Sequence, residues 1–349
     1  MRPDSLAFLR SLLEAAGPSG DERAPARAWR GYAAGFAEVD HDALGSSFAS
    51  TGSGDRTLGV FGHIDEIGLV VMHVDDDGYV WFGGVGGWTP TVLIGQRVRI
   101  LTAAGPVVGV IGKKATHLLT LEERGKPVKL DELWVDIGAS SGDQARELVR
   151  PGDLAVIEQP PVELLGGRIA SRAVDNRAGA FVAAEAVRLY AEAPGAWSLV
   201  AVASVREEIT LAGAHAGAFR LRPDAAIAID VTHASDYPSV SKNQLGDIRL
   251  GGGPAIQRGA GVHAEFSDFV VETATAEGIP YQLEGAGGKT GTDADAIHLS
   301  RAGIPTAVIS IPNRYMHSPN EIVDPGDLEA LAALVAAVAR RLDAVPTGA

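Results

Sequence analysis

Six acidic and histidine positions, spread along the chain, could together hold metal ions. Each ends or follows a short apolar run, and in chain order they are His63, Asp175, Glu207, Glu208, Asp230 and His317. Polar groups at the carboxyl ends of buried strands lie where open α/β sheets usually hold their active sites. Two imidazoles and four carboxylates at one such edge indicate a pair of divalent cations.

The complete absence of Cys narrows the chemistry of any metal site. A chain without Cys forms no disulfides, uses no thiol catalysis and builds no structural Cys–zinc site. Any metal must therefore be held by His, Asp and Glu, which is the ligand set of catalytic rather than structural zinc.

The segment GHIDEIG contains His63 and, two positions later, Asp65. In a strand these two side chains point to the same side. Asp65 can therefore accept the second ring N–H of His63, as carboxylates commonly do behind a metal-bound imidazole. A polar strand-to-loop cluster without metal is the alternative interpretation of this segment alone.

The adjacent Glu207 and Glu208 follow the apolar run SLVAVASV. Two carboxylates at a buried strand end repel each other and lose hydration unless cations compensate them. Because adjacent side chains diverge, one can bind a metal while the other reaches a water molecule at the metal, which separates a ligand from a general base. A solvated acidic turn paired with Arg206 is the alternative.

The remaining three positions also have ordinary interpretations when each is taken alone. Asp175, in SRAVDNRAG before an apolar helix, is a good helix N-cap. Asp230 ends the run AAIAI and could cap a turn, and His317 could be a loop residue. Their equivalent placement on one sheet favours the metal interpretation. Among the other histidines, His117 and His233 are the hardest to assign.

Strands and helices that position these residues alternate from about residue 165 onward. Buried strands are expected at 197–205, 224–230, 279–285 and 304–311, with helices between them, including 179–193 and 325–342. This alternation predicts an α/β fold with a mixed, mostly parallel sheet sandwiched by helices. The N-terminal helix and the strand TLGVFGHID belong to the same sheet.

Residues from about 70 to 163 have a different sequence pattern. Short β-rich pieces such as VLIGQRVRILT and PVVGVIG are separated by Gly, Pro and Asp, which predicts a small β-barrel or sandwich. We therefore expect a catalytic domain of residues 1–69 plus 164–349, into which a β-barrel-like domain of residues 70–163 is inserted.

The segment GGKTGTDADAIH, residues 287–298, is rich in Gly and precedes a helical pattern. A phosphate-binding loop is the alternative to consider, but the segment lacks the Walker spacing. We expect it to shape a substrate pocket beside the metals.

Bulk composition limits the partners. The chain has 349 residues, 46% of them hydrophobic, and a formal net charge of −14 without a Lys/Arg cluster, so nucleic acid and anionic membranes are poor partners. It has no apolar run of about 18 residues, so a membrane span is not expected. The start MRPDSLAFLRSLLEAAG does not resemble a signal peptide, and a cytoplasmic protein is the expectation.

Taken together, the motifs resemble the tetrahedral-aminopeptidase family of cocatalytic metallopeptidases, whose members are often labelled glutamyl aminopeptidase, deblocking aminopeptidase or endoglucanase-like. The matching pieces run in order through nearly the whole chain: GHIDEIG, GQRV, GVIGKK, VDIGASS, AVDNRAG, EEITLAGAHA, AIDVTHASDYP, GTDADAIH and ISIPNRYMHSPNEIV. The resemblance implies a zinc-aminopeptidase-like fold whose inserted domain helps to assemble homo-oligomers, commonly dodecamers.

The resemblance also implies a dinuclear metal centre. His63 and Asp230 would bind one ion, Glu208 and His317 would bind the other, and Asp175 would bridge both. Two divalent ions per subunit are expected. Zinc is the first expectation, and cobalt or manganese suit the same nitrogen and oxygen ligands.

Two further roles and one backbone feature follow from the same resemblance. Glu207 would be the general base, and Asp65 would orient His63. The bridging aspartate of the family is typically followed by a cis peptide, so the bond from Asp175 to Asn176 is expected to be cis.

The chain departs from the family pattern at two places near these motifs. After the glutamate pair it reads ITLAG, where the family usually has valine-glycine-leucine-arginine-glycine, and Lys289 stands in a segment that is usually a plainer glycine run. Both changes concern the pocket edge and substrate preference rather than the ligands.

The expected reaction is hydrolytic removal of the N-terminal residue from short peptides. Two alternatives remain open, a metal-dependent deacylase of N-acyl amino acids on the same fold and an inactive metal-binding assembly protein. Two carboxylates could also cleave a glycoside, but that chemistry has no need for His63 or His317.

Overall fold

A mixed eight-stranded sheet forms the main body of the computed structural model, which describes residues 1–343. In spatial order its strands are β1 (Glu38–His41), β2 (Ser47–Thr51), β12 (Ser198–Ser204), β3 (Thr57–His63), β13 (Ala225–His233), β16 (Thr306–Asn313), β14 (Ala255–Gly259) and β15 (Gln282–Ala286). The central strands β12, β3, β13 and β16 are parallel, whereas β2 and β14 pair antiparallel with their central neighbours. This is the mostly parallel sheet that the sequence predicts.

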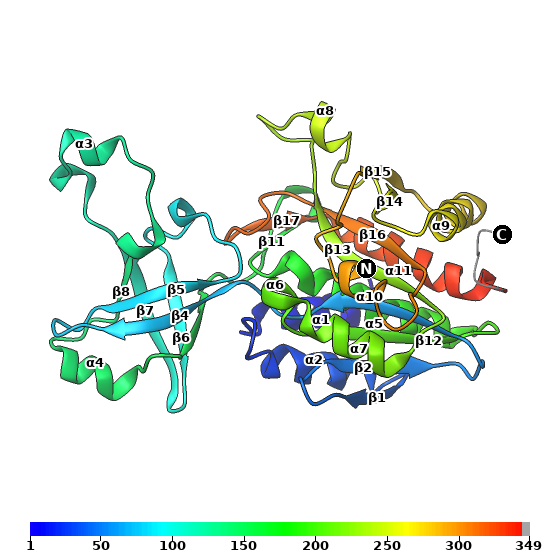
Figure 1. Ribbon diagram of the computed structural model, residues 1–349, viewed down its shortest axis with the longest axis horizontal. Coiled ribbons are helices and arrows are strands. Elements are labelled where there is room, and N and C mark those ends of the chain that lie inside the picture. The colour runs from blue at the N-terminus through cyan, green and yellow to red at the C-terminus, as the bar shows by residue number, and fades with distance from the viewer. Residues whose placement is uncertain (344–349) are drawn as a thin grey trace.

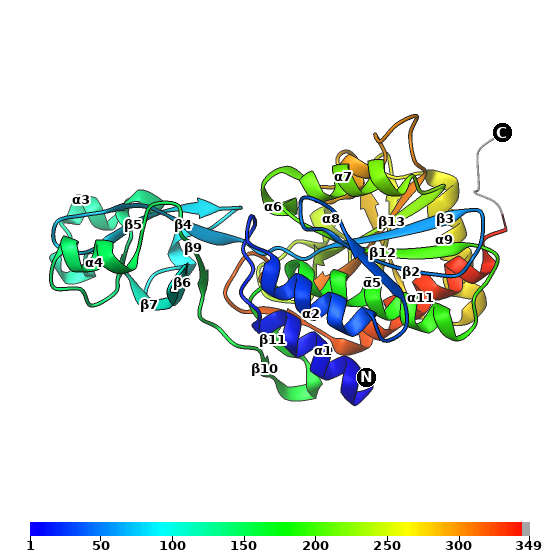
Figure 2. The ribbon, with the colours of Figure 1, turned by 90° about the horizontal axis from the view of Figure 1, so that it is seen from below.

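Helices cover both faces of this sheet (Figures 1 and 2). One face carries α1 (Pro3–Glu14), α2 (Arg23–Ala33), α5 (Val174–Glu192), α9 (Ala264–Glu277) and α11 (Pro325–Arg341). The other carries α7 (Ala212–Leu221) and α10 (Ala294–Ile297).

Successive residues of the central strands contribute alternately to the hydrophobic cores on the two faces of the sheet. Val60 and Ile227 pack in the core of the α5 face, whereas Phe61 and Ala228 pack in the core of the α7 face. Successive strand residues point to opposite faces. A strand buried on both sides must therefore be apolar at nearly every position, as these strands are.

A second, smaller body is a closed barrel that projects to one side (Figures 1 and 2). Its strands, in spatial order, are β4 (Gly68–Val74), β5 (Val80–Val85), β8 (Trp134–Asp136), β7 (Gly105–Gly112), β6 (Arg97–Thr102) and β9 (Leu154–Ile157). Two short helices, α3 (Leu121–Arg124) and α4 (Gly142–Leu148), lie in its connections. The barrel has a hydrophobic core of its own, which includes Leu69, Val98 and Val135. The division into residues 1–69 plus 164–349 and residues 70–163 stays a prediction.

A small three-stranded sheet combines the two strands that follow the barrel in the chain with a strand that follows β16. It consists of β10 (Val162–Glu163), β11 (Ile169–Ser171) and β17 (Glu321–Val323), with Ser171 paired to Glu321. Because β11 leads directly into α5, this sheet joins the start of α5 to the chain that follows β16. Two helical turns, α6 (Glu207–Thr210) and α8 (Lys242–Leu245), follow β12 and β13. Within residues 1–343, no helix has the length and apolar character needed to cross a membrane.

Candidate metal centre

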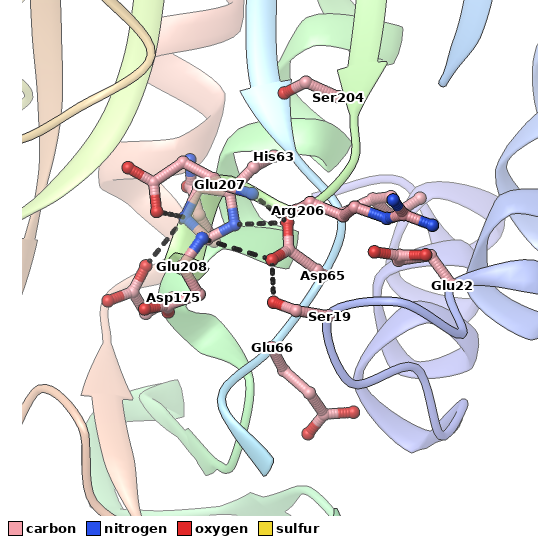
Figure 3. A network of polar contacts seen from close by, with 12 residues as sticks. Ser19, Glu22, His63, Asp65, Glu66, Asp175, Ser204, Arg206, Glu207 and Glu208 are labelled. Carbon is pink, nitrogen blue, oxygen red and sulfur yellow. Dashed lines mark hydrogen bonds and ion pairs between the residues drawn. The ribbon is translucent and has the colours of Figure 1, made fainter. Parts of the chain in front are cut away.

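The six acidic and histidine positions converge at the carboxyl ends of the central strands. His63 is the last residue of β3 and pairs in register with Ser204, the last residue of β12. Glu207 and Glu208 open α6 immediately after β12, and Asp230 lies within β13. The close view in Figure 3 shows His63, Asp175, Glu207 and Glu208 gathered at one point.

Asp175 lies between the two histidines. Its Oδ1 is 3.1 Å from Nε2 of His63, and its Oδ2 is 3.2 Å from Nε2 of His317. Oδ1 of Asp230 lies 3.8 Å from Nε2 of His63, and Oε2 of Glu208 lies 3.4 Å from Nε2 of His317. The two oxygens of one buried carboxylate thus face two separate groups of side chains.

Three groups of side chains offer ligand atoms close enough to share an ion. They are His63 with Asp175 and Asp230, Asp175 with Glu208 and His317, and His63 with Glu207 and Glu208, and within each group these atoms lie within 4.8 Å of one another. The first two groups are the two ligand sets that the family resemblance implies, and they share Asp175.

Unusual backbone geometry occurs at His317 and close to Asp175 and Glu207 in the chain. Ala173, Arg206 and His317 have φ angles of 57°, 59° and 58°, in the left-handed region that non-glycine residues rarely adopt. The peptide bond between Asp175 and Asn176 is cis, as the resemblance predicts. Non-glycine residues in the left-handed region cluster at functional sites, where the surrounding structure holds them in place.

Two of the simpler interpretations of the sequence do not describe the structure. Asp175 does not cap α5, because the backbone is not helical at Asp175 and Asn176 and it is the side chain of Asn176 that accepts a hydrogen bond from the backbone N–H of Gly179. Within residues 1–343, Arg206 forms no ion pair with Glu207 or Glu208, and Figure 3 shows its side chain extending toward Glu22.

Asp65 binds the backbone of both Glu207 and Glu208. It is fully buried and accepts hydrogen bonds from the backbone N–H groups of Glu207 and Glu208, at 3.0 and 3.2 Å. Its Oδ1 also lies 3.4 Å from Nδ1 of His63, too long for a full hydrogen bond. Ser19 donates its hydroxyl hydrogen to Oδ2 of Asp65 (Figure 3).

Burial dominates the electrostatics of the site and disfavours charge on most of its acids. Burial raises the pKa of Glu207 to about 10. Burial also raises the pKa of Asp230 and Glu208, and Asp175 adds to both effects. Asp175 is the exception, because burial there is outweighed by hydrogen bonds with His317 and His63, which lower its pKa. Two hydrogen bonds raise the pKa of His317 to about 11, and the bond with Asp175 contributes more than the bond with Glu208.

These features fit divalent cations. The donor set is imidazole nitrogen and carboxylate oxygen, which suits catalytic zinc and related ions. Oε1 of Glu208 is buried and has no hydrogen-bond partner among residues 1–343. Burial raises the pKa of three neighbouring carboxyls, and a cation bound among them would favour their ionised forms.

Sequence reasoning missed three buried residues that border this cluster, namely Ser19, Asp293 and Glu321. Asp293 accepts a hydrogen bond from the hydroxyl of Ser204 and so ties the Gly-rich segment 287–298 to the end of β12. Burial raises the pKa of Asp293 to about 6. The residue types carried no signal, because each role depends on contacts with distant segments.

The barrel also borders the site. A Cβ atom at Gly87, in the loop after β5, would lie 3.2 Å from Nδ1 of His317, and one at Gly86 would lie 3.4 Å from Cβ of Glu208. The absence of side chains at these two glycines lets the barrel loop lie directly against the cluster. The site therefore lies where the barrel meets the main sheet.

An α/β sheet that gathers His and carboxylate side chains at its carboxyl edge, with a barrel between β3 and β10 in the chain, is the fold of the zinc-aminopeptidase-like class. Residues 45–334 match the family model described as M42 glutamyl aminopeptidase, and the chain belongs to that family. As a member it is a hydrolase of the metal-dependent aminopeptidase type.

Known proteins resemble the chain over most of its length. A lysyl aminopeptidase of Pyrococcus furiosus is 37% identical over 297 residues, which cover 84% of each chain. The crystal structure of a TET aminopeptidase from the marine sediment archaeon Thaumarchaeota archaeon SCGC AB-539-E09 has a TM-score of 0.93 at 35% identity, covering 97% of each chain. The Pyrococcus horikoshii TET1 peptidase, which can assemble into a tetrahedron or a large octahedral shell, has a TM-score of 0.87 at 31% identity, covering 97% of this chain and all of the other.

Proposed function

We propose that this chain removes single N-terminal residues from short peptides with the aid of two divalent metal ions. His63 and Asp230 would hold one ion, Glu208 and His317 the other, and Asp175 both. The observation that supports this most is the placement of Asp175, whose two oxygens lie 3.1 and 3.2 Å from the two histidines. Zinc is the expected metal, and cobalt and manganese suit the same ligands. When bound, such ions polarise a carbonyl oxygen and lower the pKa of coordinated water toward about 7.

Glu207 is the proposed general base. Its Oε2 lies 3.7 Å from Nε2 of His63, so its carboxylate borders the cluster without belonging to the two groups that share Asp175. In its ionised form, which the bound cations would favour, Glu207 would take a proton from the attacking water as the water oxygen bonds to the carbonyl carbon. It would return that proton to the amine nitrogen when the C–N bond breaks, so that one peptide bond and one water are consumed.

Asp65 is proposed to position both the glutamate pair and the ring of His63. It holds the backbone of Glu207 and Glu208 and lies beside the ring nitrogen of His63 that points away from Asp175. A carboxylate in that position fixes the tautomer and the orientation of a ligating imidazole.

The similarity of the chain to a lysyl aminopeptidase and a glutamyl aminopeptidase supports an aminopeptidase over a deacylase. The experiment that separates these functions combines metal analysis of the purified protein with assays on aminoacyl anilides and N-acetyl amino acids, with and without EDTA. We expect bound divalent metal and EDTA-sensitive cleavage of the anilides. Preferential release of acetate would establish the deacylase instead, and metal binding without hydrolysis of either substrate would leave the inactive assembly protein.

We also propose that the chain forms a homo-oligomer, with a dodecamer as the expected size. The support is its similarity to the TET1 peptidase, which can assemble into a tetrahedron or a large octahedral shell, and to the dodecamer structure of PhTET1-12s. Light scattering coupled to size-exclusion chromatography tests this directly, and a purely monomeric protein would contradict it.

A further inference from the structure

Two buried carboxylates that lie outside the proposed ligand set each bind the backbone of two residues of the site. Asp65 does so for Glu207 and Glu208. Glu321, in β17, does so for the other half of the site. Its Oε2 accepts a hydrogen bond from the backbone N–H of Asp175 at 2.9 Å, and its Oε1 accepts one from the backbone N–H of His317 at 2.8 Å.

The two residues that Glu321 binds come from segments that are far apart in the chain. Asp175 opens α5, 146 positions before Glu321, whereas His317 lies in the loop between β16 and β17. His317 has a φ of 58° and a side chain that is 34% exposed, so packing alone does little to fix it. Both oxygens of one buried carboxylate are used to set the distance between these two backbones.

The partners of Glu321 distinguish it from an ordinary buried ion pair. Its side chain is 2% exposed, and among residues 1–343 no Lys or Arg forms an ion pair with it. Glu66, which is equally buried, is instead paired with Arg172 and Arg177. A buried carboxylate without a cationic partner is costly unless its oxygens accept strong hydrogen bonds, and both bonds of Glu321 end on residues of the site.

We infer that Glu321 is a positioning residue of the metal centre. It fixes Asp175 relative to His317 so that Oδ2 of the one and Nε2 of the other face the same cation. This inference rests on the proposed function, because it assigns Glu321 a role toward ions that Asp175, Glu208 and His317 would hold.

The test is the pair of substitutions Glu321→Gln and Glu321→Asp. Glutamine keeps the size of the side chain but has one oxygen, so its NH₂ group must face one of the two N–H donors. Aspartate keeps both oxygens but is too short to reach both donors. We measure the affinity for Zn²⁺ and Co²⁺ by competition with a chromogenic chelator, together with the visible spectrum of the Co²⁺ protein and its circular dichroism.

Both variants should bind at least one ion about 10- to 100-fold more weakly than the parent protein, as changes behind metal ligands commonly do. The Co²⁺ spectrum should change as well, which a purely structural role would not cause. Glu185→Gln is the matched control. Glu185 is also a buried carboxylate, on α5, but it binds Ser5, Tyr32 and Arg188 rather than the site. Its substitution should leave metal affinity and spectrum unchanged.

Parent-like affinity and an unchanged Co²⁺ spectrum in the two Glu321 variants would overturn the inference about Glu321 but leave the proposed metal centre in place. Failure of both variants to fold would also overturn it, because it would assign Glu321 to the stability of the fold. A parent protein that binds no divalent cation would instead overturn the proposed metal centre, and this inference with it.

Discussion

Nε2 of His63 lies 3.1 Å from Oδ1 of Asp175, although the two residues are 112 positions apart in the chain. Close backbone packing makes this approach possible. A Cβ atom on Gly62, the residue before His63, would lie 2.5 Å from the backbone carbon of Gly179 in α5. Because position 62 has no side chain, α5 can lie directly against β3 and bring Asp175 to the end of that strand.

Gly62→Ala should therefore damage the site as well as the fold. The added methyl must push α5 away from β3, which costs about 1–3 kcal/mol of stability for an overpacked core and separates Asp175 from His63. Thermal unfolding and chelator competition should show a lower melting temperature and weaker metal binding. Gly285→Ala in β15 is the control, because a Cβ there meets no atom within 4 Å. Parent-like metal affinity in Gly62→Ala would contradict the packing argument.

Substitution of the two adjacent glutamates should separate the base from the ligand. Glu207→Gln should keep both metal ions and lower kcat about 100- to 10,000-fold, the range for loss of a general acid–base group. Glu208→Gln should lose metal, because the amide has no charge with which to hold the ion. Metal content by mass spectrometry and kcat on an aminoacyl anilide give the two measurements. If Glu207→Gln loses the metal and Glu208→Gln keeps it, the two roles are exchanged.

The stability of the metal-free protein should fall as the pH rises. Burial is the main cause that raises the pKa of Glu207 from its ordinary value of 4.5 to about 10. Between these values the folded protein keeps a proton that the unfolded chain has released, so the free energy of unfolding decreases with pH. His317, with a pKa raised from 6.5 to about 11, acts in the same direction. Asp175, whose pKa is lowered from 3.8, acts only under more acidic conditions.

Differential scanning fluorimetry of the EDTA-treated protein between about pH 5 and about pH 9 checks this sign. The melting temperature should decrease across the range, and the decrease should be smaller in metal-free Glu207→Gln, which lacks the titrating carboxyl. Added Zn²⁺ should stabilise the protein more at the alkaline end, because the cation favours ionised carboxylates. A metal-free protein that becomes more stable with rising pH would contradict the proposed cause.

Part of this site could be predicted because strand ends are visible in the sequence. Apolar runs that stop at a charged residue placed His63 at the end of β3 and the glutamate pair after β12, and the structure has both there. Helical spacing predicted a helix from residue 179, and α5 is regularly helical after Asn176 although the element begins at Val174. The backbone at Asp175 and Asn176 is not helical, and periodicity cannot report such an interruption.

The order of the strands and the hydrogen bonds behind the ligands could not be predicted. Whether β12 or β13 pairs with β3 depends on the packing of whole layers, and here both do. Ser19 and Glu321 act on Asp65 and on backbone N–H groups, respectively, so their side chains follow no local pattern. Only the three-dimensional fold brings them together.

The contact between the barrel and the site gives the last prediction. Gly87 lies so close to His317 that a Cβ there would be 3.2 Å from Nδ1 of the ring, which is a tight contact. Gly87→Ala should shift the His317 ring by a few tenths of an ångström, weaken the ion that it would share with Glu208, and lower kcat/KM. Melting temperature should change little, because the loop around residue 87 is partly exposed rather than part of the core.

Metal affinity and kcat/KM test the prediction for Gly87→Ala. Chelator competition should show loss of affinity for one ion and not the other, because His63 and Asp230 lie outside the contact. Gly285→Ala again serves as the control for the addition of a methyl group at an open position. Unchanged metal affinity and kcat/KM in Gly87→Ala would mean that the His317 ring yields without cost, and that the barrel loop only covers the metal centre instead of fixing one of its ligands.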